Sequence, residues 1–183
     1  MIDDFELIGG PEHRKIEVVP YDEEWPSIFE QQKQRIRDAL NSKAFRIDHV
    51  GSTSIPNMSA KPIIDIQVSV DNPDNEQTFL KPLEKAGYML RVREKGHRMF
   101  RTPELDVHIH ICKTGSDWER RHLLFRDWLR TDKDDHNAYR QLKETLAEQD
   151  WETMNHYADA KSDLIQEITK HAEKWASETY WQP

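Results

Sequence analysis

Apolar residues recur at helical spacing in the first quarter of the chain. They share one face of a helix, and Pro26 suits a first helical turn, so the pattern predicts a helix over residues 26–40. A second helix is predicted over residues 73–86, because Gly87 is a typical helix stop. The apolar positions of the first helix are Trp25, Phe29, Ile36 and Leu40.

The last third of the chain also has helical periodicity. Ser116 and Glu119 have the spacing of a capping box, which predicts that a helix begins there. Another helix follows, and a third is expected over residues 154–176. Aromatic and aliphatic stripes on all three are typical of packing in a core. The stripes are Trp118, Leu124, Phe125, Trp128 and Leu129, then Tyr139, Leu142 and Leu146, then Tyr157, Leu164, Ile165, Ile168 and Trp175.

Segments with strand character lie between these helices. Two of them, 87–94 and 97–102, form a predicted hairpin around Lys95-Gly96. The others are 45–50, 61–70 and 105–112. The order of elements predicts an α/β (α+β) domain, with a mixed β-sheet, helices on one face of it and a C-terminal helical layer. We assign residues 16–183 to this domain and residues 1–15 to an N-terminal extension.

Composition narrows the class of protein. With 183 residues the chain can bury one ordinary core, and it contains no apolar run near the length of about 18 residues that suggests a membrane span. The start, Met1 to Asp4, lacks the basic and apolar regions of a secretory signal. Cys112 is the only cysteine, so a reducing compartment is the default. We therefore expect a cytoplasmic protein with no membrane partner.

Charge bears on the choice of partner. The net charge of -8 argues against nucleic acid, whose binding needs a broad basic surface. A local basic cluster lies in the middle of the chain, and it is either a solvated hairpin or a rim that meets an anionic ligand. The cluster consists of Arg91, Arg93, Lys95, Arg98 and Arg101.

Polar and apolar positions alternate in two of the predicted strands. Because side chains of a strand point alternately to opposite faces, the apolar set should be buried under helices and the polar set should lie on one open face. An ordinary solvated face is one explanation of the polar set. The other is a functional site, since His-x-His beside Asp differs from the usual Lys, Glu and Thr. The polar positions are Asp65, Gln67 and Ser69, then Asp106, His108 and His110.

A run of small residues, Gly51-Ser52-Thr53, comes directly after a predicted strand. Small residues let backbone N–H groups and hydroxyls approach a phosphate closely. Such a turn alone is weak evidence. The chain returns from it to the next strand, however, where Lys61 and Asp65 could flank the same cleft.

The string HVGSTSIPNMSAKPIIDIQV, residues 49–68, resembles the signature of GrpB-like proteins, a branch of the nucleotidyltransferase superfamily. HIHI at 108–111, WERRHLLFRDWLR at 118–130 and YADAK at 157–161 also match, so the resemblance spans about residues 16–170. It implies a nucleotidyltransferase-like fold, and a similar domain occurs as an accessory in some dephospho-CoA kinases. It also implies that Gly51 and Ser52 hold phosphates and that Asp65 is the first metal-binding acid.

One position departs from the superfamily pattern. Gln67 stands where the second acid of a two-metal centre is expected, and an amide is a poor substitute for a carboxylate on Mg²⁺. Asp106, His108 or His110 could compensate, but imidazole favours Zn²⁺ or Mn²⁺ over Mg²⁺. The candidate metal ligands are therefore Asp65, Gln67, Asp106 and His108.

Two functions remain open from the sequence. One is a binding domain for a nucleotide or CoA-like phosphate ligand, without transfer activity, which could support a partner enzyme. The other is a metal-dependent enzyme that moves a nucleotidyl group from a nucleoside triphosphate to a small or protein hydroxyl, with Asp65, His108 and His110 as catalytic residues. A His-based metallohydrolase is a third, smaller possibility. The candidate ligand contacts are Gly51, Ser52, Thr53, Lys61, Arg98 and Lys161.

Overall fold

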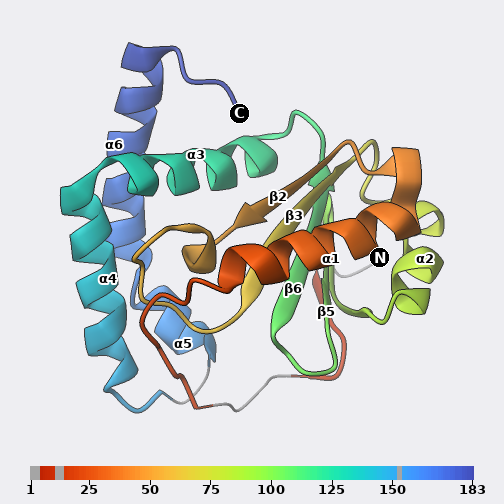
Figure 1. The fold of residues 1–183 in the computed structure, drawn as a ribbon, viewed down its shortest axis with the longest axis horizontal. Helices are drawn as coiled ribbons and strands as arrows, with labels where there is room; N and C mark the ends of the chain where they lie inside the picture. The colour runs from red at the N-terminus through yellow and green to blue at the C-terminus, as the bar shows by residue number, and fades with distance from the viewer. Residues whose placement is uncertain (1–4, 11–14, 152–153) are drawn as a thin grey trace.

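The computed structural model describes residues 5–10, 15–151 and 154–183. A six-stranded sheet in the order β1-β4-β5-β6-β3-β2 forms its centre (Figure 1). The strands are β1 (Phe5–Leu7), β2 (Arg46–Val50), β3 (Ile64–Val70), β4 (Met89–Glu94), β5 (His97–Arg101) and β6 (Val107–Lys113). The helices are α1 (Trp25–Leu40), α2 (Leu80–Lys85), α3 (Asp117–Thr131), α4 (Lys133–Ala147), α5 (Met154–Asp159) and α6 (Ser162–Thr179).

One face of the sheet is covered by α1 and α2. The predicted apolar face of α1 is buried, and it packs against the alternating apolar side chains of β3 and β6. The apolar positions of these two strands are all at most 3% exposed. Burial of this kind contributes about 25 cal/mol for each Å² of apolar surface, which makes this cluster the main source of stability. The strand residues concerned are Ile64, Ile66, Val68, Val70, Val107, Ile109 and Ile111.

Strand pairing confirms the predicted mixed sheet. β3 pairs in parallel with β6, and every other pairing is antiparallel. The predicted hairpin is present as β4 and β5. The parallel pairing places Asp65 opposite His108 and Gln67 opposite His110, so the polar positions of both strands share one face as expected. Residues from the two strands are thereby brought together at the strand starts.

The expectation that this second face is open is wrong. Gln67, Ser69 and Cys112 have no exposed surface, because α3 packs over the middle of the sheet. The side-chain amide of Gln67 donates to the backbone carbonyl of Glu119 in α3. Asp65, His108 and His110 stay partly exposed on this face, as do some side chains of the flanking strands β2 and β5.

The helical layer differs from the sequence pattern in one place. The predicted helix 154–176 is two helices, α5 and α6, with a break at Ala160 and Lys161. Tyr157 packs in one cluster with Ile16 and Leu146, whereas the apolar residues of α6 pack in others with α3 and α4. A single straight helix could not reach both sets of partners. The break turns Lys161 toward the sheet.

The predicted helix 73–86 is also shorter than expected. A 3₁₀ turn at Glu76–Thr78 precedes α2, which covers only Leu80–Lys85. Glu76 binds Arg93 and Arg98 of the hairpin, and Asp74 binds Arg98. These ion pairs to the sheet fix the segment in a non-helical path.

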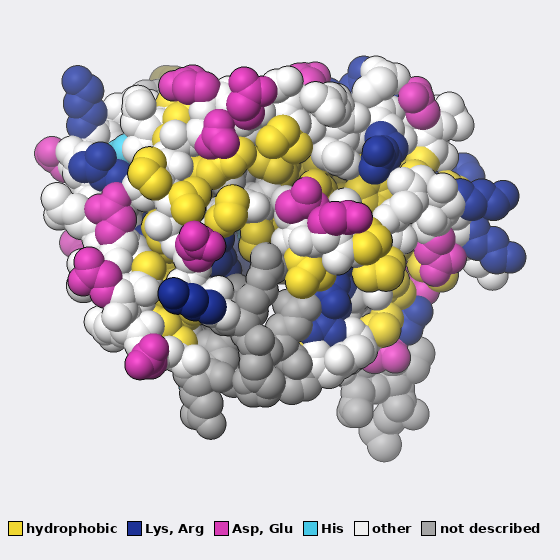
Figure 2. Space-filling model, turned by 60° about the horizontal axis from the view of Figure 1, so that its bottom comes forward, with side chains coloured by type: hydrophobic (Ala, Val, Ile, Leu, Met, Phe, Trp, Pro, Cys, Tyr) yellow, Lys and Arg dark blue, Asp and Glu magenta, His cyan; other side chains and the backbone are white. Residues whose placement is uncertain are grey.

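The N-terminal extension and the surface complete the fold. β1, within the segment assigned as an extension, pairs with β4 and adds an edge strand to the sheet. Among the described residues no helix is both long and apolar enough to cross a membrane. Acidic, basic and apolar side chains are interspersed over the face in Figure 2, where no extended basic surface is visible.

Candidate functional site

The small-residue turn after β2 lies directly against Asp65. Gly51 has a φ of 70°, a left-handed conformation that favours glycine. A Cβ atom added there would lie 2.6 Å from Oδ2 of Asp65, closer than any real contact allows. The backbone of the turn can therefore reach the carboxylate only because residue 51 is glycine. Ser54 closes the turn, and its amide and hydroxyl both donate to the Gly51 carbonyl.

Asp65, His108 and His110 form a group of one carboxylate and two imidazoles on one side of the site. Oδ1 of Asp65 lies 3.6 Å from Nδ1 of His108 and 3.5 Å from Nε2 of His110. One ligand atom from each of the three lies within 4.8 Å of the others, which is the spacing of a group that can share one metal ion. Burial alone would raise the pKa of Asp65, but hydrogen bonding and charge from the two histidines outweigh it and hold this pKa well below its usual range.

Helices α4 and α5, the turn after α5 and the loop before β3 supply the opposite, basic wall. Together with the turn after β2 and the strand starts they enclose a cavity of about 220 Å³. Lys161 lies over the ring of Tyr157 at 4.5 Å and Lys61 over the same ring at 5.4 Å, while Lys143 lies over the ring of Tyr139 at 4.6 Å. The lining residues are Gly51, Ser52, Thr53, Lys61, Ile63, Asp65, His108, Tyr139, Lys143, Tyr157 and Lys161.

Two of these lysines have unusual proton affinities. Burial and, to a lesser extent, the neighbouring charges of Lys161 and Lys61 lower the pKa of Lys143 to about 7, against the attraction of Glu144. Burial likewise lowers the pKa of Lys161 to about 8, with repulsion from Lys61 and a smaller attraction from Asp65. Three amines therefore lie close together in a partly buried wall, and an anionic ligand beside them would reduce their mutual repulsion.

The hydroxyls that line the cavity have different roles. Thr53 is buried, and its hydroxyl donates to the Ile63 carbonyl and contacts Nε2 of His49. It therefore ties the turn to the start of the next strand. Ser52 is half-buried at the cavity and is hydrogen-bonded to Tyr139. Ser52 thus lies between the turn and α4 at the edge of the cavity.

Three residues predicted for the site lie elsewhere. Gln67 is buried under α3, as described above. Asp106 is exposed just before β6, where its carboxylate accepts a 2.6 Å hydrogen bond from Thr102, because the strand begins only at Val107. Arg98 does not reach the cavity, because its guanidinium binds Asp74 and Glu76. The neighbouring Arg93 is likewise paired with acids, so the basic cluster supports the hairpin and its surroundings.

Sequence reasoning missed Lys143 and Tyr139 as site residues. Tyr139 belongs to the apolar stripe of α4 and was assigned to the core. Lys143 follows it by four residues, so both share one face of the helix. A lysine inside an otherwise apolar stripe was the available signal, because a charged side chain is seldom buried without a purpose. Lys143 is only 2% exposed and donates to the backbone carbonyl of Ser59.

A pair of Mg²⁺ ions does not fit this site. Such a centre needs several carboxylates, and Asp65 is the only acid among the residues lining the cavity. The donor set therefore suits one ion that accepts imidazole.

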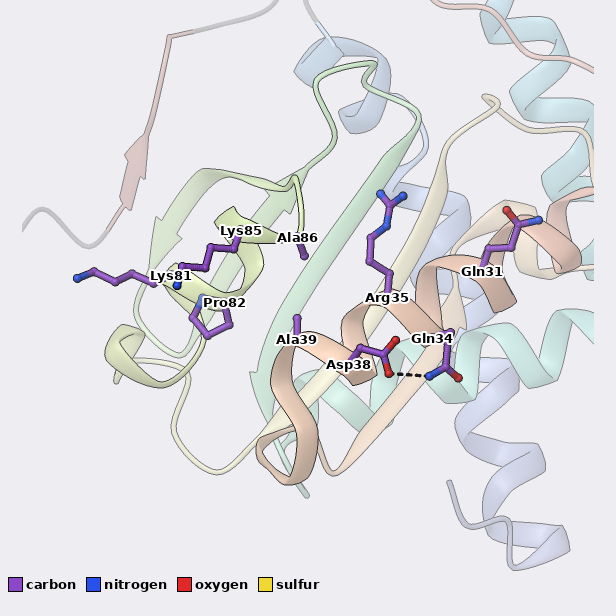
Figure 3. Close-up of a pocket in the computed structure, with 9 residues that line it drawn as sticks. All are labelled: Gln31, Gln34, Arg35, Asp38, Ala39, Lys81, Pro82, Lys85 and Ala86. Carbon is purple, nitrogen blue, oxygen red and sulfur yellow. Dashed lines mark hydrogen bonds between the residues drawn. The ribbon is translucent and has the colours of Figure 1, made fainter.

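A larger groove of about 760 Å³ lies between α1 and α2 (Figure 3). Gln34 donates to Asp38 across one turn of α1, and Lys81 and Lys85 project from α2 on the other side. The residues that line it include no histidine and no group of metal-binding side chains. Despite its larger volume, this groove therefore lacks the histidine and the candidate metal ligands of the cavity at Asp65.

The fold and the site define an α/β domain in which a small-residue turn, Asp65 with His108, and a basic wall surround one cavity, and His110 lies beside Asp65. Residues 15–171 match the family described as GrpB protein, and the chain belongs to this family. The crystal structure of conserved protein GrpB from Enterococcus faecalis is similar to this structure, with a TM-score of 0.79 and 31% sequence identity. The matched region covers 91% of this chain and 100% of the Enterococcus faecalis chain.

Proteins of similar sequence support this family assignment. A UPF0157 protein of Streptomyces coelicolor is 47% identical over 91% of this chain and 89% of its own length. A UPF0157 protein of Halalkalibacterium halodurans is 44% identical over 88% of this chain and 85% of its own length. A dephospho-CoA kinase of Mycolicibacterium paratuberculosis is 27% identical over 92% of this chain but only 48% of its own length. The domain thus occurs both as most of a protein and as part of a larger one.

Proposed function

We propose that the cavity binds the phosphate end of a nucleotide or CoA-like small molecule. The observation that carries the proposal is the meeting of the Gly51-Ser52 turn with three lysines around one enclosed space. Small-residue turns and lysines are the two groups that proteins commonly use for phosphate. A cavity of about 220 Å³ is below the usual size of a small-molecule site. It therefore suits the phosphates, with the rest of the ligand extending outward.

A divalent metal ion at Asp65, His108 and His110 is the second part of this proposal. When bound, such an ion would neutralise ligand phosphate oxygens on the side opposite the lysines. The donor set favours Zn²⁺ or Mn²⁺ over Mg²⁺, because imidazole is a poor ligand for Mg²⁺. Metal and lysines together would surround an anion with positive charge.

The relatives suggest a setting for such binding. This chain corresponds to about half of the mycobacterial dephospho-CoA kinase that it resembles. A domain that holds a CoA-like phosphate beside a partner enzyme would explain that arrangement. In that setting the chain would bind the ligand without transferring a group.

Thermal shift measurements test the binding proposal. ADP, CoA and pyrophosphate should each raise the melting temperature, because a ligand of the native state stabilises it by mass action. Ser52→Leu should abolish the rise by filling the turn, whereas the matched change Ser42→Leu, at an exposed serine, should leave it intact. Equal ligand shifts in both variants would remove the turn from the site.

Nucleotidyl transfer is the second candidate function, and the Asp65–His108–His110 group favours it. The reaction would form a bond from the α-phosphorus to an acceptor hydroxyl oxygen, release pyrophosphate and leave the hydroxyl proton on a base. In this reaction His108, which lies at the cavity, would accept that proton instead of binding the metal ion. Incubation with α-labelled nucleoside triphosphate and Mn²⁺ should label an acceptor in the wild type but not in Asp65→Asn. If the wild type binds the nucleotide yet transfers no label to small hydroxyl compounds or proteins, the binding function remains.

A further inference from the structure

A line of three polar side chains approaches the candidate metal group from behind. Nδ1 of His110, on the side of the ring away from Asp65, lies 3.1 Å from Nε2 of His97. The other nitrogen of that ring, Nδ1 of His97, lies 3.3 Å from Oε2 of Glu94. The three side chains come from β6, β5 and the end of β4, and His97 is only 6% exposed.

Packing fixes the middle member of this line. The ring of His97 stacks on Trp118 of α3, with centroids 4.2 Å apart and planes inclined by 27°. It is also nearly parallel to the ring of His110, at an interplanar angle of 13°. Trp118 in turn contacts His122, whose Nδ1 lies 2.8 Å from the Trp118 carbonyl. The His97 ring therefore has little freedom to rotate away from His110.

Hydrogen-bond polarity then determines which nitrogen carries each proton. An ionised carboxylate only accepts, so Glu94 requires the proton of a neutral His97 to be on Nδ1. Nε2 of His97 is consequently an acceptor, which requires a proton on Nδ1 of His110. The remaining nitrogen, Nε2 of His110, faces Oδ1 of Asp65 at 3.5 Å. A cation between these two atoms, either a proton or a metal ion, would be shared by both.

We propose that His97, held by Glu94 and Trp118, is a positioning residue that fixes the tautomer and direction of His110 for a bound metal ion. This inference rests on the metal site of the proposed function. Partners behind a metal-binding histidine are known to orient the ring and raise its basicity. Glu94 and His97 do so here through a second imidazole, so the influence of the carboxylate extends across two strands.

Two substitutions of His97 separate hydrogen bonding from packing. His97→Phe keeps a ring against Trp118 but removes the acceptor for His110. His97→Gln keeps an acceptor oxygen in a side chain of similar reach. In titration calorimetry of the full chain with Zn²⁺ alone, His97→Phe should weaken affinity about 10- to 100-fold and His97→Gln should restore most of it. His171→Phe, at a half-exposed histidine paired with Asp135, is the control and should bind like the wild type.

Histidine tautomers supply a readout that needs no metal. Long-range ¹H–¹⁵N correlation spectra of the metal-free protein, with His110 assigned by its loss in His110→Ala, should show the proton on Nδ1 of His110. A proton on Nε2 with none on Nδ1 would overturn the positioning role, as would equal Zn²⁺ affinity in the wild type and His97→Phe. If the wild type binds no Zn²⁺, the metal site itself fails and this role of His97 with it. Phosphate binding at the lysines, measured by the ADP shift, is tested separately.

Discussion

Anion binding at this cavity should be coupled to proton uptake by Lys143. With a pKa of about 7, this lysine is about 90% protonated at pH 6 and about 10% protonated at pH 8. Phosphate beside the amine would stabilise the charged form and return its pKa toward the ordinary 10.5. The ligand must then supply the free energy of protonation above pH 7, so the contribution of Lys143 should weaken about tenfold from pH 6 to pH 8.

Lys143→Met provides the comparison, because it replaces the amine with an apolar side chain of similar length. Titration calorimetry with ADP would measure the dissociation constants of both proteins from pH 6 to pH 9. Titration of the ligand itself affects both proteins equally, so it does not change the ratio of the variant's dissociation constant to that of the wild type. This ratio should fall toward one as the pH rises. At pH 8, heats in buffers of different ionisation enthalpy should show that the wild type takes up close to one more proton than the variant.

The pH dependence of stability gives an independent check on the direction of the Lys143 pKa shift. An unfolded lysine titrates near 10.5 and the folded one near 7, so between these values the unfolded chain binds more protons. The free energy of unfolding of the wild type should therefore rise from pH 7 to pH 10 relative to Lys143→Met. A dissociation-constant ratio that does not change with pH, together with parallel stability curves, would refute the assignment of Lys143 as a buried, weakly basic anion ligand.

Two further substitutions test the site geometry. Gly51→Ala should abolish the melting-temperature shift by ADP and should destabilise the protein by more than Gly115→Ala. Both glycines have a φ near 70°, but only at Gly51 would the new Cβ meet Asp65. Equal melting temperatures and equal ligand shifts in the two variants would contradict this. Gln67→Glu should lower the free energy of unfolding by roughly 2–4 kcal/mol, because it buries a carboxylate under α3 beside Glu119. Calorimetry of this variant should show no Mg²⁺ binding. A gain of Mg²⁺ affinity without loss of stability would show that residue 67 can reach the metal site.

The sequence alone determined which side chains of the central strands share a face. A period of two in residues 64–70 and 107–111 is a local property of an extended chain, so it predicted both the buried apolar set and the polar set that includes Asp65 and His108. The signature at residues 49–68 likewise indicated the family and the small-residue turn. These features are encoded in neighbouring positions, and no distant contact is needed to infer them.

Only the tertiary structure decided what covers the polar face and what completes the site. Nothing near Gln67 in the sequence shows that α3 packs on it, and nothing near Lys143 shows that its helix forms a wall of the cavity. The split between α5 and α6, which brings Lys161 to the same space, follows from packing against two separate clusters. Such choices depend on contacts between residues far apart in the chain, whose free energies override local helical and strand periodicity.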